Sequence, residues 1–422
     1  MAEQASTTNS LDQRYWLRHT VPPLLALLRA AGTYTAADQG EHVRLLCDHV
    51  VPNLGRRPTE SRPNNSSLTH SGFPVELSLN LNAGKPKVRF SCEFLGPKFP
   101  RDDDDTYAVG ALRQCLTSLS EELGFSTKWA EAFLDVLAPT PEEATVAQEK
   151  LQQWQTSLLP PGAVPKPASR LPFSGLAFDL VGSQARGKLY LSPQVKGLGS
   201  AKSMTETLWG VLRRLEPPMS DKAITAISEF LLERPGPPCV DMLCIDLASD
   251  QDSHDARVKL YVNTTSNSFN TVRQCMTLSG RRQDEMTLKG LEVLRSIWHL
   301  LLQEEQEVAD DYEKPVNDAS KLVMKLFFCL EITPGKDLPD VKLHVPIFNY
   351  LKSDREALCN IEDIFRKCNQ EWAANGKYRE TFESAFGDPN TVRDVPVHGY
   401  TAFAYNESGA YQTVYFGVPQ EL

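Results

Sequence analysis

Three short segments of the chain carry a cation and an aromatic residue two positions apart. In RVKLYVN (257–263), Arg257, Lys259 and Tyr261 would share one face of a β-strand, with aliphatic residues on the other. KLYLSP (188–193) and KLHVPI (342–347) repeat the order Lys-Leu-aromatic-aliphatic. In one strand alone, such a polar face is most simply exposed to solvent. Its repetition at matching places favours the interpretation that these faces line a common cavity.

Side chains of these types, brought together, would bind a polyanion. Cations that converge inside a protein repel one another unless an anion joins them. Arginine offers forked donors, lysine a point charge and tyrosine a hydroxyl, a set that suits a diphosphate. Tyrosine rings can also shield a carbocation, so the chemistry indicated is ionisation of an allylic diphosphate away from water. The candidates are Arg89, Lys188, Tyr190, Arg257, Lys259, Tyr261, Lys342, Tyr400, Tyr411 and Tyr415.

A single carboxylate, Glu76, interrupts the apolar strand pattern of SGFPVELSLNL. It could face solvent or pair with Arg89. Alternatively, it could be a buried acceptor for an N–H or O–H on a nucleophilic arene. In that position it would raise the nucleophilicity of the ring and take up a proton.

The elements that must position these residues form a repeat. The alternation predicts strand pairs with short, turn-rich connections, and helical periodicity appears between the pairs, as in DKAITAISEFLLER and TLKGLEVLRSIWHLLLQEE. The predicted pairs are 74–82 with 86–94, 173–180 with 186–193, 238–247 with 255–263, 323–332 with 341–347, and 398–405 with 410–418.

Roughly five α-β-β-α units of this kind predict an α+β fold. Five hairpins could close into one ring of antiparallel strands with helices outside, because closure removes the exposed edges of a sheet. The helices would cover the outer face of each strand, and the other face would line a central chamber. We expect residues 1–12 to be disordered, a helix at 16–31 interrupted near Pro22–Pro23, and one barrel domain over 13–422.

Composition limits the possible partners. The 422 residues carry a net charge of −10, which argues against nucleic-acid or anionic-membrane binding and requires any anion site to be a local cluster of cations. The nine cysteines include no CxxC pair and are expected to be reduced thiols of a cytoplasmic protein. The polar N-terminus lacks a signal-peptide pattern, and VPPLLALL is too short to span a bilayer.

No metal or nucleotide motif is evident. RDDDDTY (101–107) has the composition of an Asp-rich magnesium motif, but the DDxxD spacing fails at Thr106 and Tyr107, and acidic residues also suit a helix N-terminus. The eight histidines show no HExxH spacing, and no GxGxxG or GxxxxGK occurs. EEQEVADDYEK (304–314) is most simply a solvated acidic loop or helix end.

Taken together, PVELSLN, RVKLYVN, KLYLSP, LPDVKLHVP and the final HGY…AYQTVYF resemble the aromatic prenyltransferases of the dimethylallyltryptophan synthase type, over nearly the whole chain from about Tyr15. The resemblance implies a ten-stranded antiparallel barrel ringed by helices. It also implies transfer of a dimethylallyl group from dimethylallyl diphosphate to an electron-rich ring by Friedel–Crafts alkylation. No cofactor would be required, and Mg²⁺ would at most stimulate the reaction. The protein would act as a monomer or homodimer.

The resemblance also implies residue roles. Glu76 would hydrogen-bond the indole N–H and act as the base. Tyr400 would form a wall of the substrate pocket, as would His344, which stands where the repeat has a tyrosine and so alters the shield. The diphosphate would be held by Arg89, Lys188, Arg257, Lys259 and Lys342, and it would be capped, and the cation shielded, by Tyr190, Tyr261, Tyr411 and Tyr415.

Two departures bear on the acceptor. Family members that act on free tryptophan carry an arginine in the strand before RVKLYVN, where this chain has Cys244, and a lysine in the strand before KLYLSP, where FSGLAFDL has none. The expected acceptor is therefore the indole of a tryptophan-containing cyclic dipeptide or related alkaloid. A prenyltransferase of phenolic or polyketide aromatics, and a non-catalytic carrier of isoprenoid diphosphates, remain alternatives.

Overall fold

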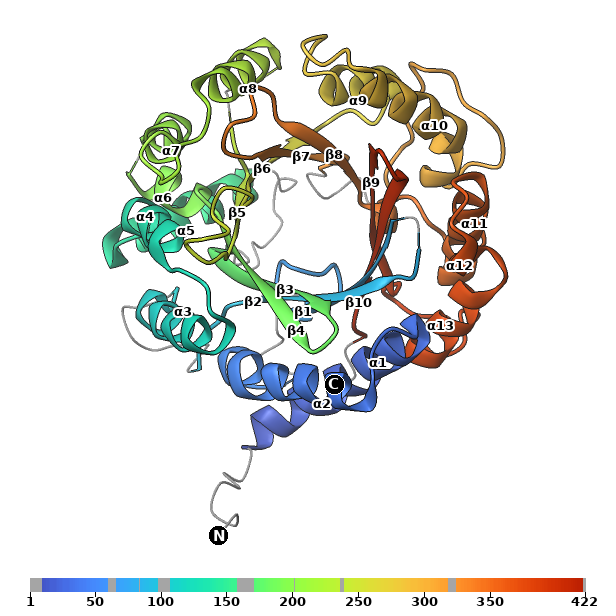
Figure 1. Ribbon diagram of the computed structural model, residues 1–422, viewed down its shortest axis with the longest axis horizontal. Coiled ribbons are helices and arrows are strands. Elements are labelled where there is room, and N and C mark those ends of the chain that lie inside the picture. Colours follow the sequence, from blue (N-terminus) through green and yellow to red (C-terminus); the bar gives the residue numbers. More distant parts are fainter. Residues whose placement is uncertain are drawn as a thin grey trace.

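A closed barrel inside a ring of helices makes up the computed structural model of the chain (Figure 1). The structure describes residues 10–59, 66–82, 84–97, 107–157, 171–200, 202–235, 239–317 and 324–419. The expected disorder of residues 1–12 falls largely outside these ranges and stays a prediction. In the view of Figure 1, the strands form an inner ring and the helices follow one another around its outside.

Ten antiparallel strands close the barrel, and each strand pairs with its neighbours in sequence, with β1 meeting β10. The predicted barrel of αββα units is confirmed. The strands are β1 (Val75–Asn82), β2 (Lys87–Glu93), β3 (Ser174–Val181), β4 (Gln184–Leu191), β5 (Met242–Asp246), β6 (Val258–Thr264), β7 (Leu326–Ile332), β8 (Asp340–Val345), β9 (His398–Asn406) and β10 (Gly409–Gly417).

Alternation along the strands separates two environments. The outward face is apolar, as with Leu77 and Leu79 on β1 and Leu260 and Val262 on β6, and it packs beneath the helices as the main core. The inward face carries the polar residues of the same strands. All odd-numbered strands run in one direction, so the turns within the hairpins lie at one end of the barrel, called here the hairpin end. The opposite end is called the Glu76 end, because β1 begins there.

Helices join consecutive hairpins and cover the barrel (Figure 1). They are α1 (Leu11–Ala31), α2 (Ala36–Leu45), α3 (Val109–Leu123), α4 (Lys128–Leu137), α5 (Pro141–Ser157), α6 (Gln194–Ser200), α7 (Met204–Leu212), α8 (Asp221–Glu233), α9 (Phe269–Met276), α10 (Glu285–Leu301), α11 (Asp354–Lys367), α12 (Glu371–Ala374) and α13 (Lys377–Phe386), with short turns η1 (Leu46–Val50), η2 (Val51–Asn53) and η3 (Ile347–Asn349).

Helix α1 corrects one expectation. It begins at Leu11 behind a capping box formed by Ser10 and Gln13, and it continues through Pro22 and Pro23 without interruption. Proline inside a helix costs about 3 kcal/mol because it removes a hydrogen bond and crowds the preceding turn. The buried face of α1, which packs against α13 and includes the fully buried Trp16, offsets that cost.

Two further features concern the cysteines and the length of the helices. All nine cysteines are free thiols. In the part of the chain that the structure describes, every helix is too short or too polar to span a membrane.

Candidate active site

The barrel interior brings the sequence-predicted cations together. The side chains of Lys188, Lys259 and Lys342 are buried, and Arg89 is four-fifths buried. Arg257 stands one residue before β6, nearer the hairpin end, and is 39% exposed. The five cations come from the second strands of four hairpins, β2, β4, β6 and β8, with Arg257 just before Lys259 at the start of β6, so closure of the barrel is what makes them converge.

Three carboxylates that the sequence reasoning missed stand among these cations. Asp179 pairs with Arg89 at 2.7 Å and with Lys188. Asp246 accepts from Arg257 at 2.7 Å and from Lys259 at 2.6 Å. Glu331 accepts from Arg257 at 2.9 Å. Each carboxylate lies in the first strand of its hairpin, and the signal was present in the segments FDL, IDL and LEI (178–180, 245–247 and 330–332).

These pairs keep the carboxylates ionised. Burial works to raise the pKa of Asp179, but the charges of Arg89 and Lys188 outweigh it and hold that pKa well below its usual range. Burial and the charges of Lys259 and Arg257 act in the same opposed way on the pKa of Asp246, with the same result. The cations outnumber these carboxylates five to three. The hairpin end of the chamber is therefore positive but partly compensated in the absence of a ligand.

Lys342 differs from the other cations, because the contacts described for it are with neutral groups. Its ammonium lies 4.3 Å from the centre of the Tyr411 ring and donates to Thr413 Oγ1 at 3.3 Å. Burial lowers the pKa of Lys342. Burial tends to raise the pKa of Tyr411, but the charges of Lys342 and Arg89 outweigh it and bring that pKa down to about 8. An incoming anion would find here a cation that has no carboxylate partner among the described residues.

A belt of aromatic rings follows the cations toward the Glu76 end. Tyr190 and Tyr261 lie 6.1 Å apart between ring centres, Tyr261 and His344 5.7 Å, and His344 and Tyr415 6.0 Å. Burial and the neighbouring Lys342 hold the pKa of His344 well below its ordinary value, so its ring is neutral. The belt therefore presents only uncharged rings next to the cations.

Glu76 is nearly alone in its surroundings. It is buried, faces the chamber from β1, and accepts one long hydrogen bond from Ser91 Oγ at 3.3 Å. Burial raises its pKa to about 8, and the Ser91 bond offsets only part of the effect. Burial raises the pKa values of Tyr400 and Tyr415, and the Glu76 carboxylate adds to the rise in both, which places it within electrostatic reach of them. A weakly solvated carboxyl of this kind can accept a hydrogen bond and then a proton.

Aromatic residues close the Glu76 end. Tyr400 contacts Phe327 and Phe348 edge to face at 6.1 and 5.4 Å between ring centres. Phe348 in turn stacks on His70, with ring centres 4.6 Å apart. His70 passes over Gly417, where a Cβ would lie 3.4 Å from the histidine ring. Phe327, Phe348 and His70 were missed because segments with no cation-aromatic signal carry them.

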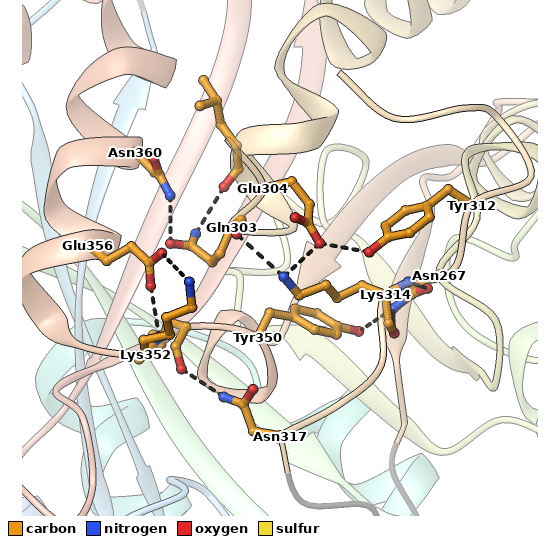
Figure 2. A network of polar contacts seen from close by, with 12 residues as sticks. Asn267, Gln303, Glu304, Tyr312, Lys314, Asn317, Tyr350, Lys352, Glu356 and Asn360 are labelled. Atoms are coloured by element: carbon orange, nitrogen blue, oxygen red, sulfur yellow. Dashed lines mark hydrogen bonds and ion pairs between the residues drawn. The ribbon is translucent and has the colours of Figure 1, made fainter. Parts of the chain in front are cut away.

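A polar network holds the segment that carries Phe348 (Figure 2). Asn317 donates its backbone N–H to Asn349 O at 2.8 Å and its side-chain amide to Leu351 O at 2.7 Å. The Tyr350 hydroxyl donates to Lys325 O and accepts from Asn267. The network extends into residues 304–314, where Glu304 accepts from Tyr312 and Lys314 at 2.7 Å each. That acidic segment is thus partly a bonded support of the pocket and not simply a solvated loop.

Two inward-facing strand positions, one on β5 and one on β3, bear on the choice of acceptor. Cys244 is fully buried on β5, opposite Tyr190 and Lys259 in the strand register. On β3, the residues that share a face with Asp179 are Gly175 and Ala177. Neither strand therefore offers an arginine or a lysine at these places in the chamber.

The described residues contain no group of three or more His, Cys, Asp or Glu side chains that could hold a metal ion. Residues 101–106 of RDDDDTY lie outside the described residues.

Known proteins resemble this chain in sequence and in fold. Residues 12–380 match the family described as "Tryptophan dimethylallyltransferase". The indole diterpene prenyltransferase terF of Tolypocladium album is 43% identical over 99% of this chain and 96% of its own. The indole diterpene prenyltransferase ltmF of Epichloe festucae var. lolii is 41% identical over 98% of this chain and 94% of its own.

Two solved structures share the fold. The crystal structure of AnaPT from Neosartorya fischeri has a TM-score of 0.78 at 23% identity and covers 98% of this chain and 97% of its own. The structure of NotF in complex with brevianamide F and DMSPP has a TM-score of 0.74 at 19% identity and covers 99% of this chain and 98% of its own. At these identities the likeness supports the barrel fold alone.

Proposed function

Since the chain belongs to the tryptophan dimethylallyltransferase family and is an indole prenyltransferase, we propose that it moves a dimethylallyl group from dimethylallyl diphosphate to the indole ring of an indole diterpene. The observation that carries the proposal is the order of groups along the inside of the barrel: cations, then neutral aromatic rings, then an isolated carboxyl.

The acceptor proposed here, an indole diterpene, differs from the cyclic dipeptide favoured by the sequence. The relatives at 43% and 41% identity are both named indole diterpene prenyltransferases, which favours a diterpene over a cyclic dipeptide. A diterpene carries no amino-acid carboxylate, and Cys244 and Ala177 offer no cation that would hold one. The aromatic wall of Tyr400, Phe348 and Phe327 suits a large, apolar polycycle.

The donor would bind with its diphosphate among the cations. Lys188, Lys259 and Lys342 would contact its oxygens, with Arg89 and Arg257 adding charge. The allylic C–O bond would break with both electrons passing to the diphosphate, whose new charge these cations would stabilise. The faces of Tyr190, Tyr261 and Tyr415 would shield the allyl cation, at about 0.5–2 kcal/mol per ring.

Glu76 would complete the reaction at the other end of the chamber. It would accept a hydrogen bond from the indole N–H, which makes the ring more electron-rich as a ring carbon attacks the allyl cation. The raised pKa of about 8 makes it a strong enough base to take up the proton that the alkylated ring must lose. Because fixed cations already neutralise the leaving group, we propose that no metal ion is required. The cytoplasmic location remains a prediction.

One experiment tests this function and both alternatives. The protein is incubated with dimethylallyl diphosphate and, separately, with an indole diterpene, a tryptophan-containing cyclic dipeptide, free tryptophan and a hydroxyarene, and product masses are read. We expect addition of one dimethylallyl group to the indole diterpene, with the other acceptors slower. Preferred alkylation of the cyclic dipeptide or the hydroxyarene would replace the acceptor proposed. Tight diphosphate binding without any product would indicate a carrier.

A further inference from the structure

A cavity of about 700 Å³ opens at the hairpin end of the barrel, away from Glu76. Its outer walls come from α2, from the end of α3, from the turn between β3 and β4, and from the loop between β5 and β6. Its lining also includes Asp179, Lys188, Asp246 and Arg257, which belong to the charged group inside the chamber. Two of the cations proposed to hold the diphosphate, Lys188 and Arg257, can therefore be reached from this side.

Arg186 lines this cavity and is not one of the five cations proposed to hold the diphosphate. Alternation along β4 places it on the same face as Lys188 and Tyr190, one step nearer the hairpin end, opposite Asp179 in the strand register. Its side chain is exposed and has no ion pair or hydrogen bond among the described residues. Arg44, on the same cavity wall, is by contrast engaged by Glu41, Asp48 and Glu122. Arg186 is thus a guanidinium available to an arriving anion.

The remaining outer groups make Arg186 more important. The cavity is also lined by Glu41, Glu122, Asp252 and Asp255, so its mouth would repel an anion if Arg186 were absent. With Arg186 present, cations follow one another inward from Arg186 to Lys188 and Arg257, and then to the buried Lys259. The Glu76 end carries no comparable series in the described residues, because Tyr400, Phe348 and His70 line it.

We propose that this cavity is the passage through which the diphosphate enters and leaves the barrel interior, with Arg186 as its first binding contact. The inference rests on the proposed function, because it takes an allylic diphosphate as the donor.

The test measures the association rate constant of inorganic pyrophosphate by stopped-flow fluorescence. Removing a guiding charge at a binding-site entrance slows association and reduces its salt dependence. We expect Arg186→Gln to lower the association rate constant about fivefold and Arg186→Glu more than about tenfold at low salt, with both differences shrinking at high ionic strength. The Michaelis constant for the arene should not change, and neither should the melting temperature, since Arg186 is exposed.

Lys336→Gln is the matched control. Lys336 lies in the turn between β7 and β8 at the same end of the barrel, pairs with Asp340, and does not line the cavity. It removes the same net charge, and its association rate should stay within twofold of wild type. Association rate constants within twofold of wild type in both Arg186 variants would contradict the proposal that the diphosphate enters through this cavity. Failure of the wild-type protein to bind pyrophosphate at all would overturn the proposed function with it.

Discussion

The two ends of the chamber solve opposite electrostatic problems. At the hairpin end, buried cations and carboxylates hold one another ionised, as Asp246 does between Arg257 and Lys259. At the Glu76 end, one carboxyl lies among aromatic rings with a single long hydrogen bond, and its pKa rises to about 8. The same barrel thus keeps charge where we propose that the diphosphate is held and removes it where we propose that the arene binds. The difference lies in the neighbours, because Lys259 and Glu76 are both buried, but of the two only Lys259 has an ionised partner among the described residues.

The largest effect is expected from Glu76→Gln, which keeps the size of the side chain but removes the base. General-base catalysis contributes typically about 10²–10⁴-fold, so kcat for prenylation should fall within that range. Pyrophosphate affinity, measured by calorimetry, should stay near wild type, because Glu76 lies at the other end. Turnover equal to wild type would remove Glu76 from the mechanism, and a parallel loss of pyrophosphate binding would show that the two ends are not separate.

The second prediction concerns the ion pairs at the hairpin end. Asp246→Asn leaves Arg257 and Lys259 without their shared counter-charge, and breaking a buried ion pair costs about 3–5 kcal/mol in free energy of unfolding. Pyrophosphate should restore more of the melting temperature in this variant than it adds to wild type, because it supplies the missing negative charge.

Asp337→Asn is the control for that loss. Asp337 forms an exposed pair with Lys222, and exposed pairs contribute about 0.2–1 kcal/mol. Equal stability losses in the two variants would contradict the view that the Asp246 pairs are buried and structurally required.

The third prediction uses pH. A base must be deprotonated before it acts, and burial holds the pKa of Glu76 at about 8. The value of kcat/KM for the arene should therefore rise about tenfold per pH unit below this pKa and level off above it, while Glu76→Gln should lose this limb of the profile.

The stability of the folded protein provides a second check of the pKa of Glu76. Activity should rise with pH up to this pKa, whereas stability should fall. The pKa of Glu76 is raised in the folded state, so its contribution is fully present below the unfolded value and is lost as pH rises through about 8. The wild-type protein should therefore lose stability relative to Glu76→Gln between pH 5 and 9, as measured by urea unfolding. A constant difference across that range would contradict the raised pKa.

The smallest effect is expected at His344. Its low pKa makes it an uncharged ring in the aromatic belt, so Phe is a close substitute, and volume-conserving changes in a core cost less than about 1.5 kcal/mol. We expect His344→Phe to keep kcat within about threefold of wild type, because both rings present an uncharged face to the allyl cation. A large increase in kcat would show that His344 carries a positive charge next to the cation and opposes its formation.

Much of the barrel could be predicted because period-two alternation marks a strand wherever both faces are distinct. The strands at 75–82 and 398–406 lie within a residue of their predicted bounds, whereas β5 is only Met242–Asp246 of the predicted 238–247. Helices such as α2 and α5 were not among those predicted. They bury little, since α2 buries only His42 and Leu45, and their apolar pattern is correspondingly weak.

The sequence indicated only some of the residues of the candidate site. Lysines and tyrosines in a repeated motif were recognisable, but Asp179, Asp246 and Glu331 were not singled out, because one acid in an apolar strand has no meaning until the barrel places it beside a cation. Phe348 and His70 depend on where two irregular segments pass over the barrel end, which no local pattern records.

The central claim is that the donor diphosphate and the acceptor indole occupy opposite ends of one chamber. A crystal structure of the protein with dimethylallyl thiolodiphosphate and an indole diterpene tests it directly. The account predicts diphosphate oxygens in contact with Lys188, Lys259 and Lys342, and the indole nitrogen within hydrogen-bonding distance of a Glu76 oxygen. A diphosphate bound outside the barrel, or an indole whose nitrogen points away from Glu76, would contradict it.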